Sequence, residues 1–268
     1  MKYFDLSGKI AIVTGVLGKL GPVWSGALLE AGAIVVGIDL PGATVSPAFA
    51  ALQEQYTEKR LCLERGDISD RLQLITISDR LLAQKGTPSI IVNNAGIDQP
   101  PGPAITYHLE DIPLEICRQI FEVNILGAFQ VIQIFGSPMV KAGKGSIINI
   151  GSLYASVSPD QRLYAHLNCE PPFLKPPAYG ASKAALVNLT RYFATHWGPF
   201  GVRVNTLSPG GVLGGQDETF KQKFSDRVPL GRMAQFNDLL GPLVFLASDA
   251  SAYVTGIDLK VDGGFTAW

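Results

Sequence analysis

Short runs of β-branched and other apolar residues alternate with helix-like stretches along all 268 residues of the chain. Seven runs have the length and composition of strands, namely Ile10–Thr14, Ile34–Asp39, Arg60–Glu64, Ser89–Asn93, Ser146–Ile150, Val202–Leu207 and Asp258–Val261. Helical spacing fills the gaps, around 18–31, 44–58, 70–85, 112–135, 178–197 and 236–248. Strands that are apolar on both faces and separated by helices predict a parallel sheet covered on both sides, with ligands at the carboxyl ends of its strands.

The bulk properties favour a single α/β domain over residues 1–268, because no Ser/Gly-rich linker or charge run divides the chain. Its 22 basic and 23 acidic residues leave a formal net charge of -1. The chain therefore has no excess of positive charge that would favour binding to nucleic acid or to an anionic membrane. We therefore expect a small-molecule partner. The longest uncharged stretch, 123–140, includes several amide side chains and a proline, and predicts a buried or interface helix, not a membrane span.

The cysteines, Cys62, Cys117 and Cys169, are odd in number and lack metal-like spacing, which suits reduced thiols in a cytoplasm. The three histidines likewise show no spacing typical of a metal site, so we expect no metal. The N-terminal stretch enters the first strand without a signal-peptide pattern, which also favours a cytoplasmic protein.

Tyr179 and Lys183 stand four residues apart in the run YGASK, and Ser152 lies upstream at the end of a strand. On a helix, positions i and i+4 share a face, so the phenol and the ammonium can point into one site. A phenol with an ordinary pKa of about 10 is a poor base at neutral pH, but a fixed cation beside it lowers that pKa. The pair therefore indicates a proton-transfer device. Taken alone, the two-position pattern is also compatible with a chance match on a surface helix.

A turn with several glycines, TGVLGKLG at 14–21, joins the first strand to the first helix. Glycines there let the backbone approach a pyrophosphate, and the helix N-terminus supplies partial positive charge. Asp39 closes the second strand, where a carboxylate accepts hydrogen bonds from adenosine ribose hydroxyls. That carboxylate repels a 2′-phosphate, which favours NAD(H) over NADP(H). Alternatively, Asp39 simply opens the turn that continues through 40–42.

Together these features resemble the short-chain dehydrogenase/reductase (SDR) family in its single-domain form. The motifs follow in family order along essentially the whole chain: TGxxxxxG at 14–21, Asp67, Asn93-Asn94-Ala95-Gly96, Asn124, Ser152, Tyr179, Lys183, Ser208-Pro209-Gly210 and Val261-Asp262-Gly263-Gly264. The resemblance implies a Rossmann fold, a doubly wound parallel sheet of seven strands with helices on both faces. It also implies a homo-oligomer, a tetramer or a dimer.

The resemblance assigns a role to each matching residue. Tyr179 is the expected acid/base, Ser152 orients the substrate oxygen, and Lys183 binds the nicotinamide ribose and lowers the pKa of Tyr179. Asn124 is the fourth catalytic candidate and holds a water in a proton relay, although it could chiefly satisfy backbone groups in a buried helix. Asn94 could likewise mainly stabilise the sheet. The implied cofactor contacts are Gly15, Gly18, Lys19, Leu20, Asp39, Leu40, Asp67, Ile68, Asn94, Ala95, Gly96, Tyr179, Lys183, Pro209, Gly210 and Val212.

Three departures from the family pattern limit how far these residue roles can be assigned to this chain. Lys19 stands where the family usually has a glycine, and it either reaches the pyrophosphate as a charged donor or points into solvent. An insert at about 157–177 lengthens the chain between Ser152 and Tyr179, and it is expected over or beside the substrate cleft or in an oligomer contact. The third departure follows Pro209-Gly210, where the segment at about 211–235 begins with a glycine-rich run. This run predicts that the segment is a mobile lid that orders with substrate.

Candidate substrate contacts are Ser152, Tyr154, Arg162 and Gly211. The stretch SLYASVSPDQRLYA also resembles SDR enzymes of bacterial surface-sugar biosynthesis, including flagellin-modification dehydrogenases.

The predicted function is hydride transfer between NAD(H) and a secondary alcohol or ketone, on a sugar or another polar metabolite. One alternative is a dehydratase or epimerase that uses NAD transiently, although such enzymes usually carry a further C-terminal domain. The other is a catalytically silent NAD-binding regulatory subunit, against which the intact Ser152, Tyr179 and Lys183 argue.

Overall fold

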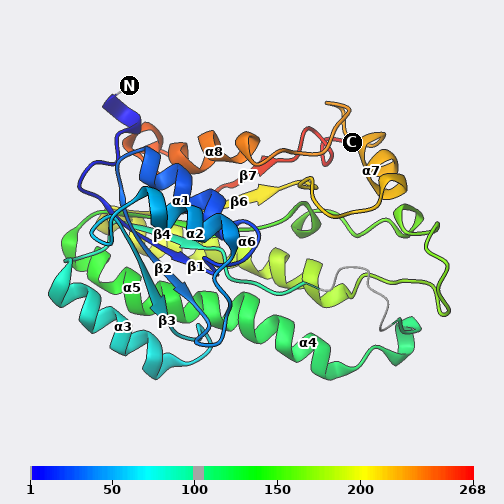
Figure 1. Cartoon of the computed structure of the whole chain (residues 1–268), viewed down its shortest axis with the longest axis horizontal. Coiled ribbons are helices and arrows are strands. Elements are labelled where there is room, and N and C mark those ends of the chain that lie inside the picture. Colours follow the sequence, from blue (N-terminus) through cyan, green and yellow to red (C-terminus); the bar gives the residue numbers. More distant parts are fainter. Residues whose placement is uncertain (1, 99–105) are drawn as a thin grey trace.

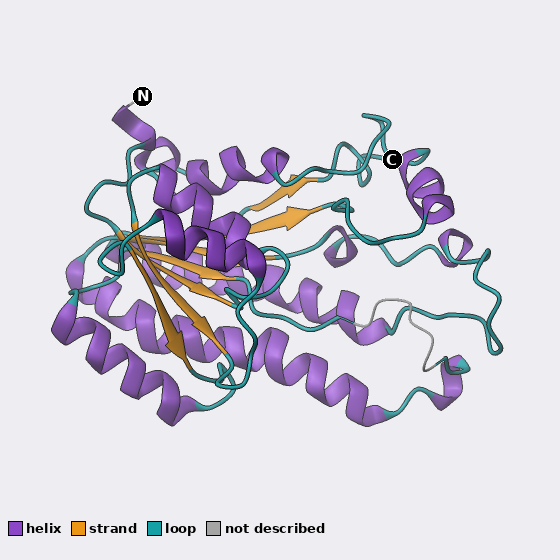
Figure 2. Cartoon of the chain, in the orientation of Figure 1, coloured by secondary structure: helices purple, strands orange, loops and turns teal. Residues whose placement is uncertain are grey.

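The computed structural model describes residues 2–98 and 106–268. Their strands form a seven-stranded parallel sheet in the order β3-β2-β1-β4-β5-β6-β7, drawn in orange in Figure 2. The strands are β1 (Ile10–Thr14), β2 (Ile34–Asp39), β3 (Leu61–Arg65), β4 (Ile90–Asn93), β5 (Gly145–Ile150), β6 (Val202–Pro209) and β7 (Asp258–Val261). This is the doubly wound Rossmann arrangement predicted from the sequence.

Helices cover both faces of the sheet (Figure 1). On one face lie α1 (Gly21–Glu30), α2 (Pro47–Gln55) and α8 (Asn237–Ala247). On the other lie α3 (Arg71–Gln84), α5 (Ala128–Ala142) and α6 (Pro177–Trp197). Two shorter helices, α4 (Leu114–Phe121) and α7 (Glu218–Ser225), complete the set of α-helices in the described residues.

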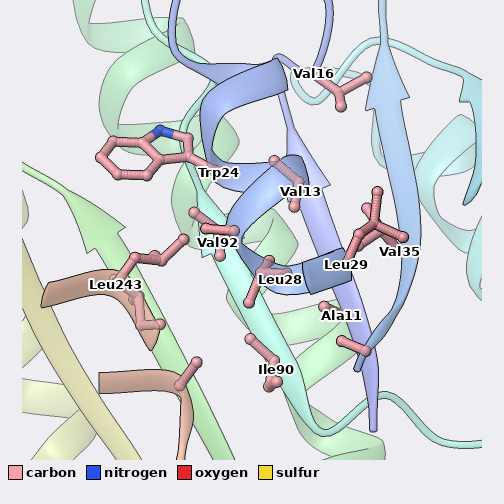
Figure 3. Close-up of a cluster of buried hydrophobic side chains, with 14 of the residues drawn as sticks. Ala11, Val13, Val16, Trp24, Leu28, Leu29, Val35, Ile90, Val92 and Leu243 are labelled. Carbon is pink, nitrogen blue, oxygen red and sulfur yellow. The ribbon is translucent and has the colours of Figure 1, made fainter. Parts of the chain in front are cut away.

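Each face buries its own apolar core. Figure 3 shows the first, in which Trp24 and Leu28 of α1 lie over Val13 of β1 and Val92 of β4, with Leu243 of α8 beside them. Burying a large apolar side chain of this kind stabilises the fold by about 1.5–3 kcal/mol. The two cores therefore hold the strand ends rigidly in place.

The strand order reverses between β1 and β4, which are neighbours in the sheet. Val13 pairs with Val92, and Asn93 pairs with Asn149, so the segments that follow β1, β4 and β5 leave the same edge of the sheet side by side. In doubly wound sheets ligands bind at this reversal, outside the carboxyl ends of the strands.

The sequence placed β1, β2 and β7 with their observed bounds, and the other strands to within two residues. It ended the long central helix too early, because the helix continues past residue 135 through Pro138 to Ala142. It also did not anticipate the π-helix of Glu122–Gly127, which joins α4 to α5, or α7 inside the predicted lid.

The helical stretch Leu114–Ala142 is long and apolar enough, by length and composition alone, to cross a membrane. Its α5 part instead packs Val131, Ile132 and Phe135 against the sheet. A core helix of a globular protein passes the same test of length, and α5 is such a sheet-covering helix.

A third apolar cluster lies outside the two cores. It joins Tyr164 and Phe173 of the predicted insert to Phe224 and Val228 after β6 and to Phe265 near the C-terminus. Apart from a short 3-10 turn, Gln161–Leu163, the insert lacks regular structure, and these buried side chains are what hold it. Figure 1 shows the insert and α7 reaching out beyond the same end of the sheet.

Candidate functional site

A cleft of about 700 Å³ opens at the carboxyl ends of the strands. Every residue that the sequence assigned to cofactor contact lines it, from Gly15 and Lys19 through Asp39, Asp67 and Asn94 to Val212. Ser152, Tyr179 and Lys183 line the same cleft. The fold thus brings together residues that are scattered over most of the chain.

The turn after β1 requires glycine at two positions. Gly15 has a φ of 62°, and a Cβ there would lie 2.7 Å from the Ala95 Cα. A Cβ on Gly21, at the first residue of α1, would lie 2.4 Å from the Gly15 carbonyl oxygen. The chain packs closely here because no side chain intervenes, and residues 17–20, directly before α1, border the cleft.

Two polar side chains fix this turn. The Leu17 amide donates to Asp39 Oδ2 at 2.7 Å, and the Leu40 amide donates to Asp39 Oδ1 at 2.8 Å. Asn94 Nδ2 donates to the carbonyl oxygens of Thr14 and Gly15 at 2.9 and 3.0 Å, while its Oδ1 accepts from Trp24 Nε1 at 2.8 Å. The Asn94 side chain therefore ties the segment after β4 to the turn after β1, and its contact with a cofactor stays a prediction.

Tyr179 and Lys183 share one face of α6 and meet Ser152 at the end of β5. Lys183 is buried, its Nζ donates to the Ile150 carbonyl oxygen at 2.8 Å, and it lies 5.7 Å from the centroid of the Tyr179 ring. Burial raises the pKa of the Tyr179 phenol, as does the Asp98 carboxylate, while a hydrogen bond with Ser152 acts in the opposite direction. The net direction differs from the sequence expectation of a lowered pKa, because burial and the Asp98 carboxylate together outweigh the hydrogen bond with Ser152.

Burial acts on the lysine as well. It lowers the pKa of Lys183 to about 8, while the Asp98 carboxylate acts to raise it. The site thus holds a phenol and an ammonium that are both shifted toward their neutral forms. Perturbed groups of this kind in a cleft are typical of functional sites.

Asn124 lies in the π-helix and does not line the cleft. Its Oδ1 accepts from the Ile97 amide at 2.8 Å, and its Nδ2 donates to the Ile97 carbonyl oxygen at 3.1 Å and to Ser182 Oγ at 3.0 Å. Asn124 therefore ties the segment after β4 to α6. The proton relay stays a prediction.

The four candidate substrate contacts are not brought together. Ser152 lines the cleft, and the Tyr154 ring stands edge-on to the Tyr179 ring at 6.5 Å. Arg162, however, is exposed and held by Asp160, with Nη2 at 2.9 Å from Oδ2. Gly211 faces the Phe224 ring and lines a separate cavity of about 220 Å³.

A second cavity of about 680 Å³ adjoins the cleft and shares Lys19, Asp98 and Gln216 with it. Its other walls come from the insert, including Tyr164 and Phe173, and from the segment around α7. The insert therefore lies beside the cleft, which is one of the two positions expected for it.

Comparison with known proteins decides the family. A sequence model described as enoyl-(acyl carrier protein) reductase matches residues 20–266. D-threitol dehydrogenase from Mycolicibacterium smegmatis is 33% identical over 274 residues, covering 98% of this chain and 95% of that protein. The chain belongs to the short-chain dehydrogenase/reductase family.

Two solved SDR structures share its fold. A gluconate 5-dehydrogenase from Burkholderia cenocepacia, in complex with NADP and tartrate, superposes with a TM-score of 0.84 at 29% identity, covering 99% of this chain and 98% of that one. A short-chain dehydrogenase from Leptospira borgpetersenii with bound NAD+ superposes with a TM-score of 0.84 at 31% identity, covering 99% and 96%. This SDR protein is thus an oxidoreductase that uses a nicotinamide dinucleotide and acts on CH–OH groups. The surface-sugar subgroup stays a prediction.

Lys19, the first departure from the SDR pattern, extends from the glycine turn across the mouth of the cleft. Its Nζ donates to the Val212 carbonyl oxygen at 3.3 Å, and a Cβ on Gly214 would come within 2.5 Å of it. This side chain links the turn to the predicted lid. Its contact with a pyrophosphate stays a prediction.

Sequence reasoning gave no individual role to three polar groups of this SDR site. Asp98, Lys175 and Gln216 border one or both cavities; Asp98 and Gln216 were not singled out from the sequence, and Lys175 was counted only among the polar side chains of the insert. For Lys175, the available signal was a lone charged residue in the proline-rich run PPFLKPP, where α6 begins. Within residues 2–98 and 106–268, no group of three or more His, Cys, Asp or Glu side chains lies close enough together to hold a metal ion.

K183M is expected to change how the stability of the SDR fold depends on pH. The pKa of Lys183 falls from its ordinary 10.5 to about 8 on folding. Between these values the unfolded chain binds more protons than the folded one, so the unfolding free energy of the wild type rises with pH across this window. The rise amounts to about 3 kcal/mol, and K183M lacks it.

Urea denaturation of wild type and K183M at pH 7, 8.5 and 10 checks this expectation. K9M is a matched control, because Lys9 is a lysine at the far end of β1 whose Nζ pairs with Asp249 at 2.8 Å. A stability difference between K183M and wild type that stays constant with pH would contradict the lowered pKa.

Proposed function

We propose that this SDR protein is an NAD-dependent dehydrogenase that oxidises a secondary alcohol of a polyhydroxylated metabolite, with Tyr179 as the acid/base. The observation that carries the proposal is the convergence of Ser152, Tyr179 and Lys183 on one wall of a cleft whose other end holds the glycine turn and Asp39. The candidate proton-transfer groups and the candidate dinucleotide-binding residues thus line the same cleft.

The residues present fit a dinucleotide. Gly15 and Gly21 allow no Cβ without a clash, which leaves the backbone of the turn directly before α1 open to a diphosphate. Asp39 presents a carboxylate at the end of β2 for ribose hydroxyls. Tyr179 and Lys183 would hold the nicotinamide ribose at the opposite end. When bound, the cofactor supplies the hydride acceptor.

The protein's own groups handle the proton. Tyr179, as phenolate, takes the proton of the substrate hydroxyl, and the Ser152 hydroxyl orients the substrate oxygen. Lys183 Nζ lies 5.7 Å from the centroid of the Tyr179 ring and is held by the Ile150 carbonyl oxygen. Its charge favours the phenolate once that form develops. In the reductive direction the phenol returns the proton to the alkoxide.

The preference for NAD rests on Asp39. Both of its carboxylate oxygens accept backbone amides, which fixes the charge at the end of β2 and holds it in the cleft. A 2′-phosphate would meet this charge at close range, so NADP is disfavoured.

The substrate class rests on the polar surroundings of Tyr179 and on the relatives. Lys175 and Asp98 lie beside the phenol and can donate to and accept from neighbouring hydroxyls. Two of the related proteins are named as a D-threitol dehydrogenase and a gluconate 5-dehydrogenase. A sugar alcohol or sugar acid fits these donors and acceptors.

Assembly and compartment complete the proposal. Leu114 and Phe121 on α4, Leu126 in the π-helix and Tyr192 on α6 are exposed on elements that contact one another, and this favours a dimer or tetramer built through these helices. All three cysteines are free, which suits a cytoplasmic enzyme.

The test is a screen of four- to six-carbon polyols, sugar acids and sugar phosphates with NAD+ or NADP+, followed by the absorbance of the reduced cofactor. We expect net formation of reduced cofactor with at least one polyhydroxylated alcohol, faster with NAD+ than with NADP+. Protein that binds NADH but reduces no cofactor with any compound would contradict a dehydrogenase. That outcome would favour transient use of NAD, or a silent subunit.

A further inference from the structure

Lys175 is a buried lysine in the last part of the insert. Only 8% of its surface is exposed, and its Nζ lies 2.6 Å from Asp98 Oδ2. Lysine is rarely buried unless its charge is paired, because removing an ammonium from water is costly. The structure therefore keeps an ion pair in the interior, between the insert and the segment after β4.

This ion pair lies against the catalytic phenol. Lys175 Nζ is 5.1 Å from the centroid of the Tyr179 ring and 5.7 Å from that of the Tyr154 ring. Tyr179 thus has two ammonium groups at similar range, Lys183 on its own helix and Lys175 two residues before that helix begins. The family resemblance accounts for the first and not for the second, which belongs to the insert.

The other groups around the phenol come from two segments. Ser152 and Tyr154 face it from the segment after β5, and Asp98 from the segment after β4. Asp98 acts to raise the pKa of Tyr179, whereas the hydrogen bond with Ser152 acts to lower it. Asp98 is therefore the charged neighbour that opposes formation of the phenolate.

Lys175 is placed to counter that effect. A cation and an anion in contact cancel much of each other's field at a third point several ångströms away. The prolines on either side of Lys175 stiffen the backbone that carries it. Loss of Lys175 would leave the carboxylate of Asp98 acting on Tyr179 without this counter-charge.

We propose that Lys175 is a positioning residue that lets Tyr179 act as a base, because its ammonium neutralises the Asp98 carboxylate beside the phenol. The inference rests on the proposed role of Tyr179 and extends it. The insert thereby contributes to the proton chemistry as well as to the wall of the substrate cavity.

The variants K175M, D98N, K175M/D98N and K175R separate a charge effect from a structural one. K175M should shift the titration of Tyr179 to higher pH by about one unit, and D98N should shift it to lower pH. The double variant should lie between the two, and K175R should keep the wild-type midpoint because it keeps the charge. K9M removes the lysine of a remote pair with Asp249 and should leave the titration in place.

The first measurement needs no substrate. Protein carrying a fluorinated tyrosine of lowered phenol pKa is titrated by ¹⁹F NMR in saturating NAD+, and the Tyr179 signal is identified by its loss in Y179F. Opposite shifts in K175M and D98N support the proposal. Equal shifts, shifts in the same direction, or no shift in either variant overturn it, and a thermal melt confirms that each variant is folded.

The second measurement is the pH profile of kcat/KM for alcohol oxidation. We expect the limb governed by Tyr179 to move about one pH unit up in K175M, with about tenfold less activity on its acid side, and to move down in D98N. Equal losses at every pH in both variants would mean that the pair only anchors the insert, and would overturn the proposal. Opposite shifts in the NMR titration of a protein that oxidises no alcohol would support the electrostatic role of Lys175 while refuting the proposed function.

Discussion

Y179F is expected to lower kcat for alcohol oxidation by about 10²–10⁴-fold, the range for loss of a general acid or base. The substitution removes the hydroxyl that takes the substrate proton and keeps the ring that packs beside Tyr154 and Lys183. Binding of NADH, followed by its fluorescence, should change little, because the ring and the Lys183 contact remain. Stopped-flow and steady-state rates of cofactor reduction measure the effect.

Y154F is the matched control for this variant. Tyr154 is a second partly buried phenol whose ring stands 6.5 Å from that of Tyr179, and burial likewise raises its pKa. Y154F should retain kcat to within about tenfold, since Tyr154 is not expected to accept the substrate proton. The reverse order of effects would place the acid/base at Tyr154 and contradict the assignment of Tyr179.

D39N is expected to shift the cofactor preference toward NADP+. The ratio of kcat/KM for NAD+ to that for NADP+ should fall by about 10- to 1,000-fold, because a fixed negative charge no longer faces the 2′-phosphate, an interaction of roughly 1–4 kcal/mol. Asparagine keeps the size of the side chain and an oxygen able to accept the Leu17 amide. Initial rates with both cofactors give the ratio directly.

D67N provides the control for D39N. Asp67 is a second carboxylate that lines the cleft, and its Oδ1 accepts the Ser69 amide at 2.8 Å. Its loss should weaken NAD+ and NADP+ alike and leave their ratio close to that of the wild type. An unchanged ratio in D39N, with a folded protein in the thermal melt, would mean that Asp39 serves only to hold the turn.

The sequence predicts the scaffold well, because the scaffold is built from local signals. The β-branched runs of β1, β2 and β7 end at Thr14, Asp39 and Val261 as predicted. The glycine turn and the YGASK helix are also contiguous in the chain. Each of these features is fixed by neighbours in the sequence, by steric needs such as the positive φ of Gly15, or by helical spacing.

The missed features depend on contacts between distant parts of the chain. Lys175 and Asp98 are 77 residues apart, so no period in the sequence could pair them. The helix α7 did carry a local signal, since the Asp217 side chain caps it at the Phe220 amide and Phe220 and Phe224 lie four residues apart. The glycine-rich start of that segment outweighed this signal in the sequence reasoning.

The apolar cluster outside the sheet cores has a consequence for how such enzymes diverge. Tyr164 and Phe173 of the insert pack in one cluster with Phe224 after β6 and Phe265 near the C-terminus, and the last two rings stack at 4.8 Å. A change in the insert alone would leave these partners facing a void, at a cost of several kcal/mol. The insert, the segment after β6 and the C-terminal segment therefore depend on one another for packing. Engineering a new substrate specificity into this fold requires all three segments to be exchanged together.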